Sequence, residues 1–194
     1  MKILFLTNNE ISLKLFEWLN KNEEVRLHSK VINCDEIKNI DFIISYNYKH
    51  IIAKEIIEMM PKRIINLHIS YLPYNRGAMP NIWSIIDNTP KGVTIHYIDD
   101  GLDTGEVIFQ KEITLIDDDT LKTSYNKLHD EIQMLFKQNW NNIKNGHVKS
   151  YKQKGEYTMH TMKDFKNIER IITSWNMTIK DFKMAYNEIK KEKE

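Results

Sequence analysis

The sequence predicts an α/β domain in which a mostly parallel sheet is flanked by helices. Short, largely apolar runs such as residues 3–6 and 41–46 are typical of parallel strands that are buried on both faces. Segments with apolar side chains at helical spacing alternate with these runs. Polar turns follow the strands, and in α/β proteins such turns are the usual place for a ligand site.

The N-terminal part contains the elements of a strand–helix–strand core. Residues 3–6 form the first predicted strand, and Asn9 is a suitable N-cap for a helix over 11–22. Strands follow over 25–32 and 41–46, with too few residues between them for a full helical crossover. That crossover helix is therefore expected to be missing or to be a single turn. A helix stopped by proline and another strand complete this part, over residues 49–60 and 63–69.

The remainder of the chain holds shorter elements and one long helix. A short helix over 81–87 precedes two predicted strands over 92–98 and 106–113. The longest helix spans 120–145 and ends at an Asn-Gly pair. Two further helical patterns cover residues 165–175 and 178–191. We therefore expect a main domain and a short helical C-terminal extension, over residues 1–149 and 150–194.

Composition excludes several classes of function. The net charge is +1 with a pI near 7.8, so no overall field attracts nucleic acid or an anionic membrane. The N-terminal apolar run is too short for a signal peptide or a membrane span. Cys34 is the single cysteine, which rules out an internal disulfide. We expect a cytoplasmic protein that binds neither nucleic acid nor membrane. The sequence contains no G-x-G-x-x-G, so the fingerprint of dinucleotide-binding proteins is absent.

The candidate catalytic residues lie on one predicted strand and in one predicted turn. Asn66 and His68 lie two residues apart on a strand, so their side chains point to the same face near its carboxyl end. An amide can donate to a developing oxyanion, and an imidazole can donate or move a proton. Asp103, in a Gly-rich turn, is the candidate carboxylate that orients the imidazole. Each residue alone has a structural explanation, and only the combination favours catalysis; His96, on a strand interior, is expected to be structural.

These residues belong to a longer pattern that resembles the folate-dependent formyltransferase family. The pattern is N-L-H-x-S-x-L-P followed by R-G, then G-V-T-x-H and D-x-G-x-D-x-G. The resemblance implies a Rossmann-like formyltransferase fold with a shortened N-terminal half. It also implies that Asn66 and protonated His68 stabilise the oxyanion of a tetrahedral intermediate. Asp103 would hold the imidazolium and help to remove a proton from the attacking amine.

The resemblance further implies N10-formyltetrahydrofolate as the co-substrate. The segment with Tyr48, His50, Ile51 and Ile52 resembles a family loop that lines the pterin pocket, largely through backbone groups. The turn with Asp99 and Asp103 resembles the opposite wall of that pocket. Ordinary packing is the alternative for the segment, because an apolar pair at the start of a helix is also common in cores. No metal is expected, because His68 and Asp103 lack further ligands at a recognisable spacing.

Five residues are candidates for binding the acceptor substrate. Arg76, in the loop after the predicted strand, can meet an anionic group, or it can simply be solvated. Asn81 and Trp83, at the start of the next helix, are weaker candidates, and Trp83 is equally suited to the core. Asn8 and Asn9 can bind a phosphate or sugar at a helix N-terminus, or they can act only as caps.

The acceptor is the least determined part of the prediction. The loop and the downstream D-T-L-x-x-x-Y-x-K-L pattern look most like sugar N-formyltransferases, which act on nucleotide-linked amino sugars. A methionyl-tRNA or other small-amine formyltransferase is the first alternative, although too few residues follow 145 for an RNA-binding domain. A non-catalytic folate- or sugar-nucleotide-binding protein of the same fold is the second, and a generic hydrolase is the third. The oligomeric state is left open, with a homodimer as one candidate.

Overall fold

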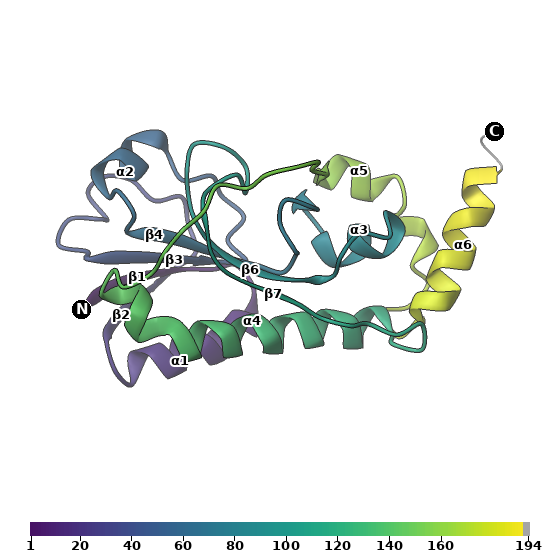
Figure 1. Cartoon of the computed structure of the whole chain (residues 1–194), viewed down its shortest axis with the longest axis horizontal. Coiled ribbons are helices and arrows are strands. Elements are labelled where there is room, and N and C mark those ends of the chain that lie inside the picture. The colour runs from purple at the N-terminus through teal and green to yellow at the C-terminus, as the bar shows by residue number, and fades with distance from the viewer. Residues whose placement is uncertain (192–194) are drawn as a thin grey trace. The chain divides into compact units, whose positions relative to one another are not determined.

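A six-stranded sheet in the order β2-β1-β3-β4-β6-β7 positions the residues predicted to act (Figure 1). The computed structural model describes residues 1–191. Strands β1 to β4 are parallel, and β6 pairs antiparallel with β4, which confirms the mostly parallel sheet. The six strands cover Lys2–Leu6, Glu24–His28, Phe42–Tyr46, Ile64–His68, Gly92–Tyr97 and Val107–Glu112.

The chain forms two compact units, and each unit draws on several segments of the sequence. Unit 1 consists of Met1–His68, Thr94–Phe109 and Ile132–Gln153. Unit 2 consists of Ile69–Val93, Gln110–Glu131 and the described part of Lys154–Glu194. The boundary near residue 150 that the sequence predicts between a main domain and an extension stays a prediction.

In unit 1, helices cover both faces of the sheet (Figure 1). Helix α1 (Leu13–Asn20) and the C-terminal part of α4 (Leu121–Lys144) lie on one face. Phe42 of β3 meets Trp140 of α4 edge to face, with ring centroids 5.5 Å apart. Such aromatic pairs add to the hydrophobic free energy of burial that holds a helix on a sheet.

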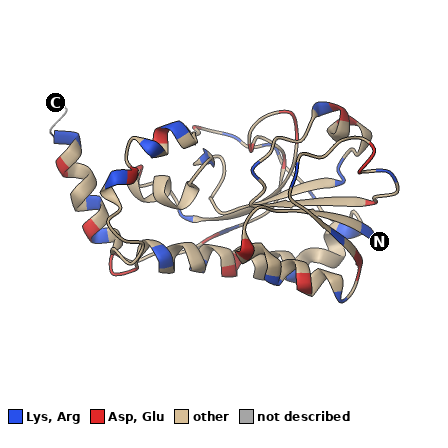
Figure 2. Cartoon of the chain, turned by 180° about the vertical axis from the view of Figure 1, so that it is seen from behind, with Lys and Arg blue, Asp and Glu red and all other residues tan. Residues whose placement is uncertain are grey.

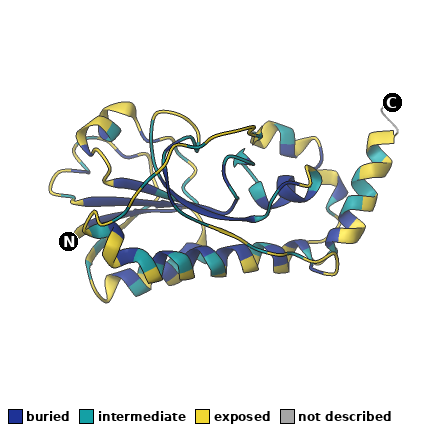
Figure 3. Cartoon of the chain, in the orientation of Figure 1, coloured by how far each residue is buried: buried dark blue, intermediate teal, exposed yellow. Residues whose placement is uncertain are grey.

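Helix α2 (Lys54–Met59) covers the opposite face of the unit 1 sheet. Alternate residues of the strands point to this face and form one apolar cluster with α2. The buried members of the cluster are Leu4, Leu6, Ile32, Ile37, Ile43, Ile52, Ile56, Met60 and Ile64. Figure 3 shows the inner strands of this sheet as almost entirely buried. The cluster ends at Ile64, and the polar side chains of β4 continue along the same face.

A buried carboxylate ties the end of α4 to the start of the chain. Glu23 is 4% exposed and accepts hydrogen bonds from the Lys144 Nζ at 2.7 Å and the Trp140 Nε1 at 3.1 Å. Its other oxygen lies 3.2 Å from the N-terminal ammonium of Met1. Burial raises the pKa of Glu23, but these donors outweigh it and hold the pKa below its ordinary value.

Unit 2 packs short helices around its own core. Helices α3 (Pro80–Ile86), α5 (Met162–Lys166) and α6 (Ile179–Lys191) surround it, with a 3₁₀ turn, η2, over Glu169–Ile171. Strands β5 (Arg76–Gly77) and β8 (Met159–His160) pair in parallel and form a separate two-stranded sheet. The buried core residues are Ile82, Trp83, Ile85, Leu121, Phe165, Ile168, Ile171, Ile179 and Phe182. The helical pattern predicted over 178–191 is therefore confirmed as α6. The pattern predicted over 165–175 is helical only in part, because α5 ends at Lys166 and only the 3₁₀ turn over Glu169–Ile171 follows.

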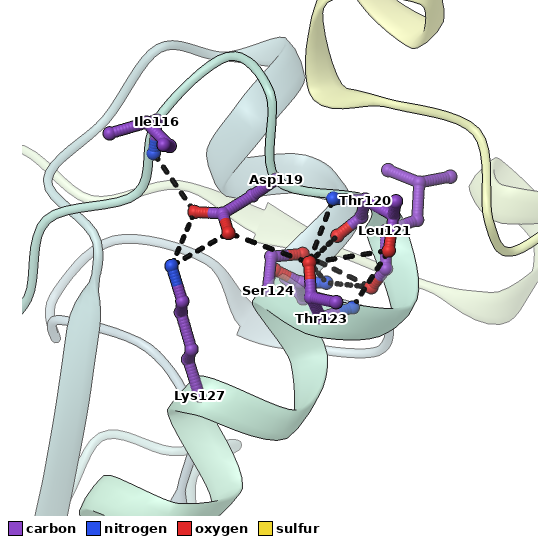
Figure 4. A network of polar contacts seen from close by, with 8 residues as sticks. Ile116, Asp119, Thr120, Leu121, Thr123, Ser124 and Lys127 are labelled. Carbon is purple, nitrogen blue, oxygen red and sulfur yellow. Dashed lines mark hydrogen bonds and ion pairs between the residues drawn. The ribbon is translucent and has the colours of Figure 1, made fainter.

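The N-terminus of α4 is fixed by a polar network around Asp119 (Figure 4). The Asp119 carboxylate accepts from the Ile116 backbone N–H at 3.0 Å and from Lys127 Nζ at 2.6 and 2.8 Å. Burial raises the pKa of Asp119, but the Lys127 ammonium and the Ile116 N–H outweigh this and hold that pKa below its ordinary value. At its other end α4 stops at Lys144, and Gly146 follows with a φ of 70°, the left-handed conformation that is usual just after a helix.

Two elements differ from the sequence prediction. The helix predicted over 49–60 begins only at Lys54, because Asn47 has a φ of 54° and the Asn8 side chain accepts a hydrogen bond from the Lys49 N–H. The strand predicted over 25–32 ends at His28, and turns without a helix lead to β3. Asn33 organises these turns, because its Oδ1 accepts from two following backbone N–H groups.

Residues of both charge signs are interspersed along the described chain, as Figure 2 shows. Among residues 1–191, no helix is long and apolar enough to cross a membrane.

Candidate active site

The two polar residues of β4 lie just beyond the apolar cluster under α2. Asn66 and His68 share a face with Ile64, because side chains alternate along the strand. The intervening Ile65 and Leu67 are buried on the opposite face. Because β4 runs parallel to β1 and β3, its carboxyl end opens at the edge where α/β proteins bind ligands. The location predicted for Asn66 and His68 is therefore confirmed.

Asp103 is brought to these residues by the turn between β6 and β7. The Asn66 Nδ2 donates to the Asp103 Oδ1 at 3.1 Å, and the His68 Nδ1 lies 3.7 Å from the Asp103 Oδ2. The carboxylate is 11% exposed, so solvent screens these contacts only weakly. The three predicted residues thus form one cluster within unit 1, with one carboxylate oxygen directed to each partner.

His96 joins the same cluster from the neighbouring strand. In the antiparallel pairing of β4 and β6, His96 is opposite Asn66, which places both side chains on one face. Its Nδ1 donates to its neighbour's carbonyl, Tyr97 O, at 2.7 Å, so in the neutral ring Nε2 is an acceptor. The Asn66 Nδ2 reaches this Nε2 at 3.3 Å, and the Asp103 Oδ1 lies 3.4 Å from it. His96 therefore helps to orient the Asn66 amide and lies beside the Asp103 carboxylate, although the sequence suggested only a structural role.

This arrangement can stabilise negative charge and handle a proton. Asn66 has an amide donor whose orientation is set by Asp103 and His96. Because Nδ1 of His68 faces Asp103, its Nε2 is the ring nitrogen directed away from the carboxylate. A carbonyl oxygen beside both groups would receive an amide and an imidazole donor, as an oxyanion requires.

The residues predicted to contact folate are arranged in two backbone segments of unit 1. Tyr48 Oη donates to Lys30 O at 2.6 Å, and His50 Nε2 lies 3.2 Å from Ser29 O, so both side chains anchor the irregular segment before α2. Ile51 is 86% exposed and Ile52 is buried. An irregular backbone with a projecting apolar side chain fits a flat pterin ring, but that contact stays a prediction.

Asp99 shapes the opposite segment, the turn that carries Asp103. Its Oδ1 accepts from the Thr104 Oγ1 at 2.6 Å and from the Gly101 backbone N–H at 3.2 Å. Such bonds to the following residues close the turn on itself. Asp99 therefore acts on the geometry of the site, and any contact between Asp99 and folate also stays a prediction.

Two of the predicted substrate residues belong to unit 1. Asn9 caps the first helical turn, because its Oδ1 accepts from the Ile11 N–H at 3.1 Å. Asn8 links two loops through its Nδ2, which donates to Ser29 O, and its Oδ1, which accepts from the Lys49 N–H. Both asparagines thus hold the carboxyl edge of the sheet in shape, and their contact with a substrate stays a prediction.

The other three predicted substrate residues belong to unit 2. Arg76 lies in β5 with its guanidinium 4.8 Å from the centre of the Tyr157 ring. Asn81 is 4% exposed, and its Nδ2 donates to Leu121 O and Ser124 Oγ. Trp83 is 7% exposed and stacks on His160 with ring centroids 4.0 Å apart. Asn81 and Trp83 therefore contribute to the core of unit 2, which is the alternative that the sequence left open for Trp83. Contact of either residue, or of Arg76, with a substrate stays a prediction.

The sequence contained a pattern from which the place of His96 in the cluster could have been predicted. In G-V-T-x-H, Thr94 and His96 alternate on a strand next to N-L-H, so both can share its polar face. Gln153 carried no such signal. Its Nε2 donates to the carbonyls of Asp103 and Gly105 at 2.8 and 2.9 Å, across 50 and 48 residues of sequence.

Comparison with known proteins identifies the family. The formyl transferase family model matches residues 6–138. The crystal structure of the formyltransferase PseJ from Anoxybacillus kamchatkensis, in complex with UDP-4,6-dideoxy-4-formamido-L-AltNAc and tetrahydrofolate, shares 40% identity and a TM-score of 0.87, covering 94% of this chain and 97% of that one. The chain thus spans nearly the whole of that solved relative.

Curated relatives include enzymes with two kinds of acceptor. A dTDP-4-amino-4,6-dideoxyglucose formyltransferase of Mycobacterium bovis is 32% identical over 135 residues, which are 70% of this chain and 57% of that protein. A methionyl-tRNA formyltransferase of Fusobacterium nucleatum is 38% identical over 122 residues, 61% of this chain and 39% of that protein. The chain spans about half the length of the curated relatives it matches. With its assembled Asn66, His68 and Asp103 and a family model that matches most of its length, the chain belongs to the formyl transferase family.

Proposed function

We propose that this protein transfers a formyl group from N10-formyltetrahydrofolate to the primary amine of a nucleotide-linked amino sugar. The cluster of Asn66, His68 and Asp103 at the carboxyl edge of the sheet carries this proposal. The solved relative that was crystallised with a formamido sugar nucleotide and tetrahydrofolate supports it, because this chain covers 97% of that relative.

The residues of the cluster divide the chemistry between them. As the amine nitrogen bonds to the formyl carbon, negative charge develops on the formyl oxygen. Asn66 Nδ2 keeps one N–H on Asp103 and turns the N–H that faces His96 Nε2 toward this oxygen, and protonated His68 donates to it from Nε2. Asp103 holds the His68 ring by Nδ1 and receives the proton that the amine must lose, directly or through water. The bond between the formyl carbon and N10 of the folate then breaks, and the proton that Asp103 received passes to N10, directly or through water, so that the site returns to its starting state.

A sugar nucleotide is a better acceptor candidate than tRNA. The formyltransferase crystallised with a formamido sugar nucleotide is similar over 94% of this chain, whereas the methionyl-tRNA formyltransferase of Fusobacterium nucleatum is similar over 61% of it. The net charge of +1 also provides little attraction for a polyanion. A cytoplasmic location and a homodimer, both expected from the sequence, accompany this proposal as predictions.

A transfer assay with a panel of acceptors tests the proposal. The purified chain is incubated with N10-formyltetrahydrofolate and either UDP- or dTDP-linked 4-amino-4,6-dideoxy sugars, or methionyl-tRNA. Release of tetrahydrofolate and gain of one formyl group by the acceptor, detected by mass spectrometry, are the expected results for at least one sugar nucleotide.

The outcomes separate the alternatives. Transfer to methionyl-tRNA in preference to every sugar nucleotide would overturn the sugar assignment and keep the enzyme class. Folate binding without turnover of any amine would favour the non-catalytic binding protein. Equal activity of wild type and His68→Ala would contradict the role of the cluster.

A further inference from the structure

The segment that follows α4 returns to the turn that carries Asp103. Tyr151 forms an isolated antiparallel bridge with Val107, through backbone hydrogen bonds of 2.9 and 3.0 Å in the two directions. This bridge fixes the segment along β7 in unit 1. It brings Gln153 to the Asp103 turn, although the two residues are 50 positions apart in the sequence.

The Gln153 side-chain amide spans this turn. Its Nε2 donates to the Asp103 carbonyl at 2.8 Å and to the Gly105 carbonyl at 2.9 Å. A primary amide has two N–H groups, so one nitrogen satisfies both carbonyls. The two carbonyls flank Thr104, and the amide therefore closes the chain directly after the catalytic carboxylate.

The backbone of Asp103 requires support of this kind. Its φ is 53°, in the left-handed region that residues with a Cβ rarely adopt. Such a conformation persists where the surrounding structure determines it from several sides. On one side, Gly105 lies against β6 so closely that an added Cβ would stand 1.8 Å from the Tyr97 carbonyl oxygen. On the other side, Gln153 holds the carbonyls.

We propose that Gln153 is a positioning residue that acts through Asp103. The role for catalysis rests on the proposed formyl transfer. If the amide is lost, the turn can relax and carry the Asp103 carboxylate away from Asn66 and His68, which now lie at 3.1 and 3.7 Å. A misplacement of about 1 Å can lower a rate by about 100-fold. Gln153 contacts the backbone of the turn, so its loss lowers kcat and leaves the KM for the acceptor amine unchanged.

Three substitutions test this role in the full chain. Gln153→Met removes both donors at similar side-chain length, and we expect kcat to fall by about tenfold, the value of one or two lost hydrogen bonds. Gln153→Glu keeps the shape but sets a carboxylate against two carbonyls, so its kcat should be lower still. Gln153→His retains one N–H donor and should recover most of the activity. Gln138→Met, at an exposed position of α4, is the matched control with wild-type kcat.

Hydrogen exchange of the turn gives a second readout that does not depend on activity. In Gln153→Met, backbone amides of residues 101–105 should exchange faster, while those of the inner strands β3 and β4 stay as slow as in wild type. A general increase in exchange would instead indicate a merely structural role and overturn the proposal. Unchanged kcat in both Gln153→Met and Gln153→Glu, or unchanged exchange of the turn, would also overturn it. A wild type without formyl transfer would refute the proposed function, and exchange would then decide alone whether Gln153 holds the turn.

Discussion

Unit 1 and unit 2 each contain residues that the sequence suggested for the site, and they use them differently. In unit 1, Asn66, His68 and Asp103 are directed toward one another at the end of a strand. In unit 2, Asn81 and Trp83 are buried, and they bond or stack within the core of that unit. Asparagine thus belongs to the proposed site in unit 1 and to the packed core in unit 2.

The difference follows from local geometry. On β4, the strand period places the two polar side chains of Asn66 and His68 together on one face. On α3, the apolar residues Ile82 and Ile85 already face the core, and Trp83 joins them. A polar residue beside a motif is therefore a weak predictor of function unless its strand or helix face is known.

Replacement of Trp83 gives the largest expected effect on stability. Because Trp83 is 7% exposed and stacks on His160, Trp83→Ala should lower the free energy of unfolding by about 3–5 kcal/mol, measured by urea denaturation. Trp83→Phe keeps most of the buried volume and preserves the fold. If Trp83→Phe raised the KM for the sugar nucleotide with stability intact, Trp83 would contact substrate, and the assignment to packing would be wrong.

Acid should weaken unit 2 through His129. Burial lowers the pKa of His129 from 6.5 to about 3, so the folded ring stays neutral where the unfolded ring takes up a proton. Its contribution to stability is complete above pH 6.5 and is lost as pH falls toward 3, at about 1.4 kcal/mol per pH unit. His129→Gln should flatten this slope between pH 6 and about 4. His147→Gln, at an exposed position, is the control, and equal slopes for the two variants would contradict the prediction.

The smallest effect is expected at the capping box of α5. Thr161 Oγ1 accepts from the Asp164 N–H at 3.3 Å, and Asp164 Oδ2 accepts from the Thr161 N–H at 2.7 Å. Thr161→Ala should lower the free energy of unfolding by about 1 kcal/mol without changing kcat, because it frees one helix N–H. A large fall in kcat would show that unit 2 influences the chemistry more than its packing indicates.

The sequence predicted those elements whose pattern is local. β1, β3 and β4 are short apolar runs, and α4 has a long apolar stripe, so each was identified to within a few residues. The start of α2 was wrong because Ile51 and Ile52 imitate the apolar side of a helix. Their backbone is held irregular by Asn8, which lies 41 residues before the Lys49 N–H that it binds. No local pattern records that contact.

The residues of the site likewise divide into those that a local pattern predicts and those that only long-range contacts bring together. Asn66 and His68 share one strand, so their common face could be predicted from spacing. Asp103 was the candidate carboxylate in the Gly-rich turn, and the family resemblance gave the three residues their roles. The position of His96 depends on the register between β4 and β6, and that of Gln153 on the return of the chain after α4. Both are long-range contacts. The alternation of Thr94 and His96 indicates the face of His96 but not the strand register, and no local pattern indicates the contact of Gln153.

The central claim is that the β4 cluster performs formyl transfer, and Asn66→Ala tests it most directly. Loss of one oxyanion donor should lower kcat by about 100- to 1,000-fold with a sugar nucleotide as acceptor. Asn66 is only half-buried, so the melting temperature and folate binding of the variant should stay close to those of wild type. A folded Asn66→Ala protein that releases tetrahydrofolate at the wild-type rate would contradict the account.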